Sequence, residues 1–168
     1  MKRLVAGLVI AVVLAIPAVV LAGVLFPPDN DFQGRIEGDP NTYLGFDKAH
    51  HKVGNFAMAL PLNCYSGDRG IAQTTLDKRF RLQRVFPPHS GLPKALRRLR
   101  VFFGAGPVET DTAGSGSAAV FGLLSPHRRP QGEVDVTTHG ESFGKCYSGR
   151  LDWNVRRGAH VTLPPPGP

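Results

Sequence analysis

The segment Phe56–Cys64 constrains the fold more than any other, because large apolar residues or cysteine occupy every second position along it. A period of two is the side-chain repeat of a β-strand that has one face in a core. Pro61 lies within this segment and has no N–H to donate, so we expect the strand to lie at a sheet edge or to carry a bulge there. The side chains predicted to face the core are Phe56, Met58, Leu60, Leu62 and Cys64.

Shorter segments with strand patterns occur along the rest of the chain. The 20 glycines and 15 prolines favour short strands joined by turns over long helices. We therefore expect an all-β fold, an antiparallel β-sandwich or flattened barrel of about eight to ten strands. The other predicted strands are 32–36, 42–46, 71–76, 80–82, 118–124, 133–138 and 151–155.

Two central segments have different patterns. Leu92, Leu96 and Leu99 are separated by four and three residues, which predicts one or two helical turns. A strand over Arg100–Phe103 is the alternative for the residues that follow. The segment Ala105–Ser117 is rich in Gly, Thr and Ser and predicts a mobile loop.

The N-terminus has the pattern of an export signal. Lys2 and Arg3 precede an apolar segment, residues 4–26, which contains no charged residue and is long enough to span a bilayer as a helix. Two interpretations remain open: a signal peptide cleaved between Ala22 and Gly23, or a single transmembrane anchor formed by residues 1–26. Both place the rest of the chain outside the cytoplasm by the positive-inside rule, so we expect a secreted or extracytoplasmic protein.

The remaining chain divides by composition. Residues 27–31 are predicted to be a linker, and residues 32–157 contain all the strand patterns and are predicted to form one β-domain. A domain of this size buries about two-thirds of its unfolded surface, which is enough for a hydrophobic core. Residues 158–168 end in a Pro-rich sequence and are predicted to be a disordered tail.

The chain contains two cysteines, Cys64 and Cys146, and both follow the export segment. An oxidising compartment favours a disulfide between them. Each begins a Cys-Tyr-Ser-Gly sequence at a predicted strand end. For a closed loop of about 80 residues, chain entropy gives about 4.5 kcal/mol of stabilisation. We therefore predict a structural disulfide, because neither cysteine has the signals of a reactive thiol.

Several short motifs mark the two ends of the predicted domain. It opens with Phe32-Gln-Gly-Arg-Ile-Glu-Gly38, followed by the alternating strand that ends in Cys64. It continues with Val120-Phe-Gly-Leu-Leu124 and Gln131-Gly-Glu-Val134, and closes with Cys146-Tyr-Ser-Gly-Arg-Leu-Asp-Trp153. Together they resemble a loose group of secreted small β-domain proteins of unknown function from actinobacteria and related Gram-positive bacteria. The resemblance covers residues 31–157, and its most specific part is the final C-x-[ST]-G-x-L-x-W. It implies an exported β-domain with one disulfide and implies no site, because the group has no established activity.

Basic residues cluster in stretches of the chain, whose formal net charge is +7. The stretches are 78–84, 94–100, 127–129 and 156–157. On a sheet, arginines from the first two are predicted to align on one exposed face and bind anions, with Tyr65 or Tyr147 at its border. The alternative is a set of solvated charges without a partner. The candidate anion-binding residues are Arg79, Arg81, Arg97, Arg98 and Arg100.

Catalytic and metal-binding motifs are weak. Gly140-Glu-Ser-Phe-Gly144 matches the spacing of a nucleophile elbow, and Asp152 and His160 follow Ser142 in the order of a hydrolase triad. That motif requires a helix after the serine, whereas turn and strand residues follow here, so we interpret it as a hairpin turn. The histidines lack the spacing of a metal site, although a site assembled from distant loops stays open. They are His50, His51, His89, His127, His139 and His160.

The sequence thus predicts an exported cell-envelope or secreted protein that binds or scaffolds a component of unknown identity through the loops 86–98 and 104–117, without enzymatic activity, metal or cofactor. One alternative is a module that binds an anionic polymer, such as an acidic glycan, teichoic acid or nucleic acid, through its Arg/Lys face. A second alternative is a hydrolase or metal-dependent enzyme that uses Ser142 or the histidines. The expected partner is an envelope or extracellular component, and also the membrane if residues 4–26 are retained.

Overall fold

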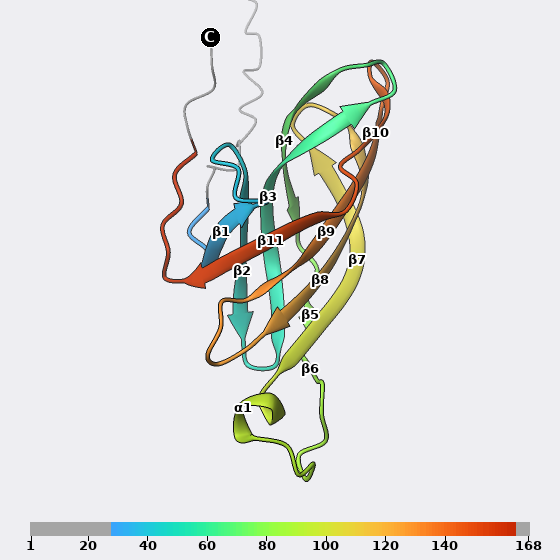
Figure 1. The fold of residues 1–168 in the computed structure, drawn as a ribbon. Helices are drawn as coiled ribbons and strands as arrows, with labels where there is room; N and C mark the ends of the chain where they lie inside the picture. The colour runs from blue at the N-terminus through green and yellow to red at the C-terminus, as the bar shows by residue number, and fades with distance from the viewer. Residues whose placement is uncertain (1–27, 164–168) are drawn as a thin grey trace, which may run out of the picture.

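The computed structural model describes residues 28–163, which form an almost entirely antiparallel β structure with one short helix (Figure 1). The predicted signal peptide or anchor, residues 1–26, lies outside the described residues, as does its cleavage site. Nowhere in 28–163 is there a helix of the length and apolar character that crossing a membrane requires. The elements are β1 (Phe32–Ile36), β2 (Tyr43–Ala49), β3 (Lys52–Cys64), β4 (Arg69–Leu76), β5 (Phe80–Arg81), β6 (Gln83–Arg84), α1 (Lys94–Arg97), β7 (Arg100–Thr110), β8 (Ser115–Leu124), β9 (Gln131–Gly140), β10 (Gly144–Tyr147) and β11 (Leu151–Arg157).

The strands pair into a sheet that closes on itself. β1 pairs with β2 and β11, and from β2 the order continues through β3, β4, β7, β8 and β9 back to β11. The short strands β5 and β6 pair with β3 and β7, and β10 bridges β3 and β9. All these pairs are antiparallel. The predicted all-β fold is therefore confirmed, in its flattened-barrel form.

The barrel is filled by a cluster of aromatic side chains from four strands. Phe46, Phe56, Phe102 and Trp153 are each at most 2% exposed, and their ring centroids lie 5.3–6.2 Å from those of their neighbours in the cluster. Each occupies an inward position in the alternation of its strand. The alternation over 56–64 therefore predicted correctly which side chains of this strand face the core. Burial of this apolar surface is the main driving force for the closed sheet.

Pro61 lies where β3 changes its partner strand. β2 pairs with β3 as far as Ala59, and β10 begins to pair with it at Asn63. Between these two points, β3 has a paired neighbour only on the β4 side, where Pro61 faces Ile71. The missing N–H of proline is tolerated at such a local edge, as the sequence predicted.

The predicted disulfide joins Cys64 at the end of β3 to Cys146 of β10. The two cysteines face each other directly in the antiparallel register. Besides this pair, β10 contacts β3 in register only through Tyr147 and Asn63. The covalent bond therefore reinforces a short link between two halves of the chain.

The prediction of a mobile loop over 105–117 is wrong, because this segment forms the end of the long β7–β8 hairpin. A Cβ on Gly106 would lie 2.7 Å from Leu76 Cδ1, and one on Gly116 would lie 2.0 Å from the Thr137 carbonyl oxygen. These glycines allow close packing within regular strands, so their number here does not indicate flexibility.

The predicted disordered tail is ordered over its first residues. Val161 and Leu163 pack on an outward apolar patch of β2 and β3 that includes Ala57 and Ala59. The Val161 N–H also donates to Gln33 Oε1 at 3.0 Å. The composition of the tail did not predict this packing. It depends on the alanines on the outward face of β3, whose apolar surface is buried when the tail covers them. Residues 164–168 lie outside the described part of the chain.

The predicted linker, residues 27–31, supplies a buried polar side chain. Asn30 is 8% exposed, and its Nδ2 donates to Asp47 Oδ1 at 3.2 Å and to the Asn55 carbonyl oxygen at 3.0 Å. The Tyr43 hydroxyl lies 3.0 Å from Asn30 Oδ1. Burial raises the pKa of Tyr43 well above its ordinary value, and the carboxylates of Asp47 and Asp29 raise this pKa further. Tyr43 therefore stays a protonated donor that fixes Asn30 against the barrel.

We expect Asp47→Asn to lower the free energy of unfolding by about 1–2 kcal/mol at neutral pH. Burial acts to raise the pKa of Asp47, but hydrogen bonds from Asn55, the Asp31 N–H and Asn30, together with the charge of Arg79, outweigh it and lower the pKa below 3.8. A carboxylate with a lowered pKa stabilises the fold above its unfolded-state pKa, and this stability is lost as the pH falls through the folded-state pKa. Urea unfolding at pH 7 and at pH 3 measures the effect.

The difference between wild type and Asp47→Asn should shrink at pH 3. Asp77→Asn is the control, because Asp77 is exposed and its carboxylate makes no hydrogen bond to the described residues. An equal destabilisation by Asp47→Asn at both pH values would show that the carboxylate charge is not responsible.

Candidate functional site

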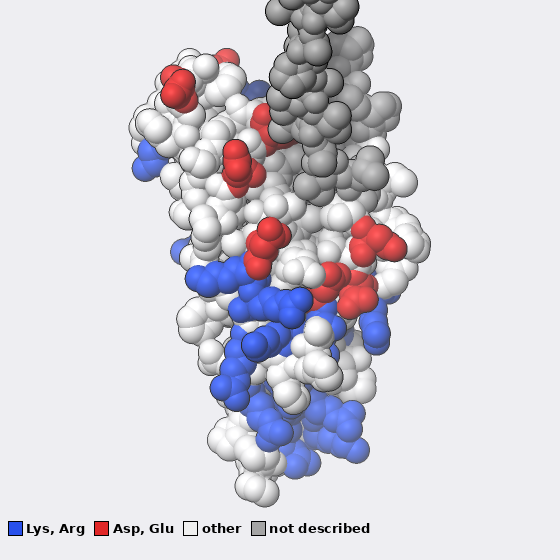
Figure 2. Space-filling view, turned by 180° about the vertical axis from the view of Figure 1, so that it is seen from behind, with Lys and Arg blue, Asp and Glu red and all other residues white. Residues whose placement is uncertain are grey.

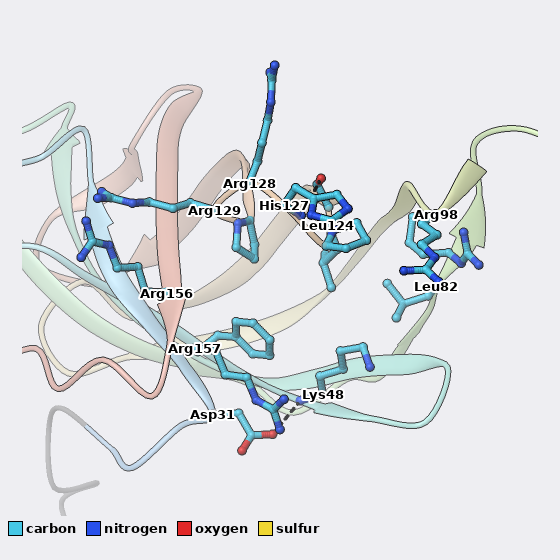
Figure 3. A pocket seen from close by; sticks show the side chains of 15 residues that line it. Asp31, Lys48, Leu82, Arg98, Leu124, His127, Arg128, Arg129, Arg156 and Arg157 are labelled. Carbon is cyan, nitrogen blue, oxygen red and sulfur yellow. Dashed lines mark hydrogen bonds between the residues drawn. The ribbon is translucent and has the colours of Figure 1, made fainter. Parts of the chain in front are cut away.

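One open end of the barrel contains a groove of about 580 Å³ whose walls are rich in basic side chains (Figure 3). The walls come from the starts of β1 and β7, the ends of β2 and β11, Arg98 between α1 and β7, and the connection between β8 and β9. A groove of this volume is within the range of small-molecule sites. We call it the basic groove. Its charged lining residues are Lys48, Arg98, Arg100, Arg128, Arg129, Arg156, Arg157 and Asp31.

Three of the cations occupy inward positions of their strands beyond the end of the core. Each is two residues along the strand from a buried core residue, so its side chain lies on the same face as that residue. At this end of the barrel, the inward direction leads into the groove instead of the packed interior. The pairs of core residue and cation are Phe46 and Lys48 on β2, Phe102 and Arg100 on β7, and Val155 and Arg157 on β11.

A backbone hydrogen bond brings together two further parts of the groove. The Val155 N–H donates to the Pro130 carbonyl oxygen at 3.0 Å, which holds the β8–β9 connection against β11. Arg129 and Arg156 therefore lie on the same side of the groove, whereas Arg128 extends away from the other labelled side chains (Figure 3). The hydrogen bond thus fixes the backbone positions from which the Arg129 and Arg156 side chains extend.

The floor of the groove is apolar. Phe32, Leu82 and Leu124 line it, and the Phe32 ring stacks on Phe46 with centroids 5.1 Å apart. The floor is therefore the outer layer of the barrel core, and the cations surround it. A ligand in the groove would meet apolar surface below and positive charge at the sides.

The cations of the groove have no carboxylate partner among the described residues. The one ion pair within 4.0 Å in residues 28–163 joins Arg150 to Glu133, and neither lines the groove. Asp31 Oδ2 accepts a hydrogen bond from the Lys48 backbone N–H at 3.3 Å. In the view of Figure 2, Lys and Arg gather toward the end that carries α1, while most Asp and Glu lie toward the other end. This segregation produces a positive potential around the groove, which attracts anions.

The structure brings only two of the five predicted arginines into the groove, Arg98 and Arg100. The Arg100 guanidinium also donates to the carbonyl oxygens of Arg97 and Leu99 at 3.1 and 2.9 Å, so part of it holds the end of α1. Arg97 donates to the Pro88 carbonyl oxygen at 3.2 Å and stabilises the preceding loop.

Arg79 and Arg81 lie away from the groove lining. The Arg79 stem passes over Gly54 in the β2–β3 hairpin, where a Cβ would lie 2.6 Å from Arg79 Cγ. Arg81 lies opposite Lys52 in the β5–β3 pair. Arg79 and Arg81 therefore do not join Arg98 and Arg100 in the groove lining, because β5 pairs with β3 whereas Arg100 begins β7.

Sequence reasoning left most of the groove out of the candidate set. Arg128, Arg129, Arg156 and Arg157 were visible as basic pairs, but only the barrel closure shows that their segments meet. Lys48 belongs to no basic cluster. Lys48 could be recognised only from its inward position two residues after Phe46. That position indicates a groove residue only once the structure shows that the core ends at Phe46.

The predicted aromatic border of the anion site lies at the opposite end of β3. Tyr65 follows Cys64, and Tyr147 follows Cys146, so both rings flank the disulfide. They contact each other edge to face with centroids 5.9 Å apart, and both are exposed. Neither lines the basic groove.

Ser142 lies in the turn between β9 and β10, so a strand and not a helix follows it. Asp152 faces Glu133 near the start of β9, whereas Ser142 follows the end of that strand at Gly140. The seven residue steps from Glu133 to Gly140 span about 23 Å along β9. The structure therefore does not assemble Ser142 and Asp152 into a triad. Across residues 28–163, no three His, Cys, Asp or Glu side chains are grouped as metal ligands.

A comparison with protein-family models, a search of curated proteins and a search of solved structures each found no match to this chain.

Proposed function

We propose that this protein is an extracytoplasmic β-domain that binds an anionic component of the cell envelope in the basic groove, without catalysing its conversion. The observation that carries the proposal is the convergence of seven cations from separate segments on one groove whose single acidic residue is Asp31. The disulfide supports a location in an oxidising compartment.

The chemistry of the lining favours phosphate or carboxylate groups as ligands. Guanidinium groups present planar pairs of N–H donors that match these anions, and charge-assisted hydrogen bonds are stronger than neutral ones. Like charges held close together repel one another, so an anion that enters between them relieves that repulsion. Arg129 and Arg156 are the pair best placed to bind it together, since the Val155–Pro130 hydrogen bond fixes their segments.

We expect the double variant Arg129→Gln/Arg156→Gln to bind inorganic polyphosphate about tenfold more weakly than wild type at moderate salt, because two partly exposed ionic contacts are lost. Affinity of the wild type should fall steeply with salt, and the variant should show a shallower dependence. Titration at several salt concentrations, together with the salt needed to elute each protein from heparin, measures both quantities.

The matched control is Arg69→Gln/Lys145→Gln, which removes the same charge from exposed residues near the disulfide end. It should bind polyphosphate within about twofold of wild type, because screening limits the reach of surface charge to about 10 Å. Equal weakening by both double variants would assign binding to net charge alone, and salt-insensitive binding would contradict an electrostatic groove.

A further inference from the structure

A second pocket, with leucines on one side, shares a wall with the basic groove. Residues of the β8–β9 connection, Ser125 and His127–Arg129, line both the groove and a neighbouring space of about 280 Å³. The other side of that space is formed mainly by apolar residues, with one polar residue from β9: Ala95 and Leu96 of α1, Leu99, Leu123 of β8 and Gln131 of β9. Cationic and apolar binding surfaces therefore lie on the two sides of one short segment.

The leucine side chains of this pocket are not buried in the barrel core. α1 buries none of its residues, and Leu96 is 40% exposed. Leu123 occupies an outward position of β8, between the buried Gly122 and Leu124, and is half-buried. A purely hydrophilic anion would use the arginines and leave these leucines in water. A ligand that also carries a hydrocarbon chain would cover them.

We infer that the ligand is an amphiphile with a phosphate headgroup and an alkyl chain, an individual anionic lipid molecule. The inference rests on the proposed function and extends it from an anion to a class of lipid. The headgroup binds between the arginines of the basic groove, and the chain lies either in the pocket of Leu96, Leu99 and Leu123 or on the apolar floor around Leu82. Charge complementarity fixes the headgroup, and continuity of the shared wall lets one molecule reach both surfaces.

The length of the alkyl chain provides the test. Inorganic phosphate, butyl phosphate and hexyl phosphate are titrated into the full chain at constant salt in a neutral detergent. Each alkyl phosphate is kept below the concentration at which it aggregates. Each buried methylene is expected to increase affinity about fourfold, so hexyl phosphate should bind well over tenfold more tightly than inorganic phosphate.

Two variants locate the chain. Leu96→Ser/Leu123→Ser should lose most of the gain from chain length if the chain lies beside α1, and Leu82→Ser should lose it if the chain lies on the groove floor. Phe103→Ser is the control, because Phe103 is 63% exposed on β7 and lines neither surface. Affinity for inorganic phosphate should be unchanged in Leu96→Ser/Leu123→Ser and in Phe103→Ser, which also shows that these two variants are folded. Because Leu82 lines the groove itself, the fold of Leu82→Ser is checked by circular dichroism and urea unfolding.

Two results would overturn the inference, and they are distinguishable. If inorganic phosphate and hexyl phosphate bind equally well and the Arg129/Arg156 pair still matters for polyphosphate, the groove binds anions but not lipids, and the proposed function stands. If no phosphate ligand binds and polyphosphate binding is insensitive to the arginine pair, the proposed function fails as well. Equal loss of chain-length dependence in Phe103→Ser would also overturn the assigned chain positions.

Discussion

Replacing Cys64 and Cys146 together with serine is expected to lower the free energy of unfolding by about 4 kcal/mol. The disulfide closes a loop with a sequence separation of 82 residues. Chain entropy for such a loop gives about 4.5 kcal/mol, and losses of about 2–5 kcal/mol are typical of small exported domains. A loss of this size is a large part of the stability of such a domain, roughly a quarter to four-fifths of the usual 5–15 kcal/mol. Urea unfolding of the two proteins under non-reducing conditions measures the difference.

The control for the disulfide is Ser66→Ala, an exposed position in the turn that follows Cys64, which should change the free energy of unfolding by less than about 0.5 kcal/mol. Wild type measured in excess reductant should reproduce the stability of the double serine variant. A loss below about 1 kcal/mol would show that β10 is held to β3 mainly by its two register pairs, so that the unfolded chain gains little freedom when the bond is removed.

Trp153→Ala is the second large expected effect, a loss of about 4 kcal/mol in the free energy of unfolding. Trp153 is 2% exposed, and its ring lies 5.9 Å from Phe46 and 6.2 Å from Phe102 between ring centroids. Truncation removes the largest side chain of the core and leaves a cavity that the rigid closed sheet cannot fill by collapse. Thermal and urea unfolding of the variant check the prediction.

Trp153→Phe is the comparison that separates volume from polarity. The indole Nε1 is buried and has no hydrogen-bond partner among the described residues. Phenylalanine keeps an aromatic contact with Phe102 and removes that unpaired N–H, which offsets part of the lost packing. The cost should therefore be about 1–2 kcal/mol. A loss in Trp153→Phe as large as that in Trp153→Ala would mean that the indole N–H stabilises the fold.

The strand content was predictable because alternation is a local property of the sequence. Residues 32–36 form β1 as predicted, and the alternation over 56–64 belongs to the longer β3. The predictions that were wrong were those based on amino-acid composition instead of on the alternation of apolar residues. The glycines of 105–117 signalled a loop, although Gly106 and Gly116 serve close packing between strands. The Pro-rich end signalled a free tail from residue 158, although Val161 covers apolar surface on β3.

The candidate site was only partly predictable. Arg98 and Arg100 were named from their local basic stretch, and they do line the groove. Arg79 came from an equally basic stretch but lies over Gly54 on the outside of a hairpin. The sequence shows that a residue is charged and often which face of a strand it occupies. It does not show which strand ends are neighbours, so it cannot distinguish a cation at the groove from one in open solvent.

The sequence alone determined that this chain builds antiparallel strands, places Phe56 and its alternating partners inside, and pairs Cys64 with Cys146. These properties depend on side-chain period and on the number of cysteines, which are read along the chain. Only the tertiary structure decided that Lys48, Arg129 and Arg157 meet. Their meeting depends on the closure of β11 onto β1 and β9, a contact between distant segments that is fixed by burial of the aromatic core and leaves no local pattern in the chain.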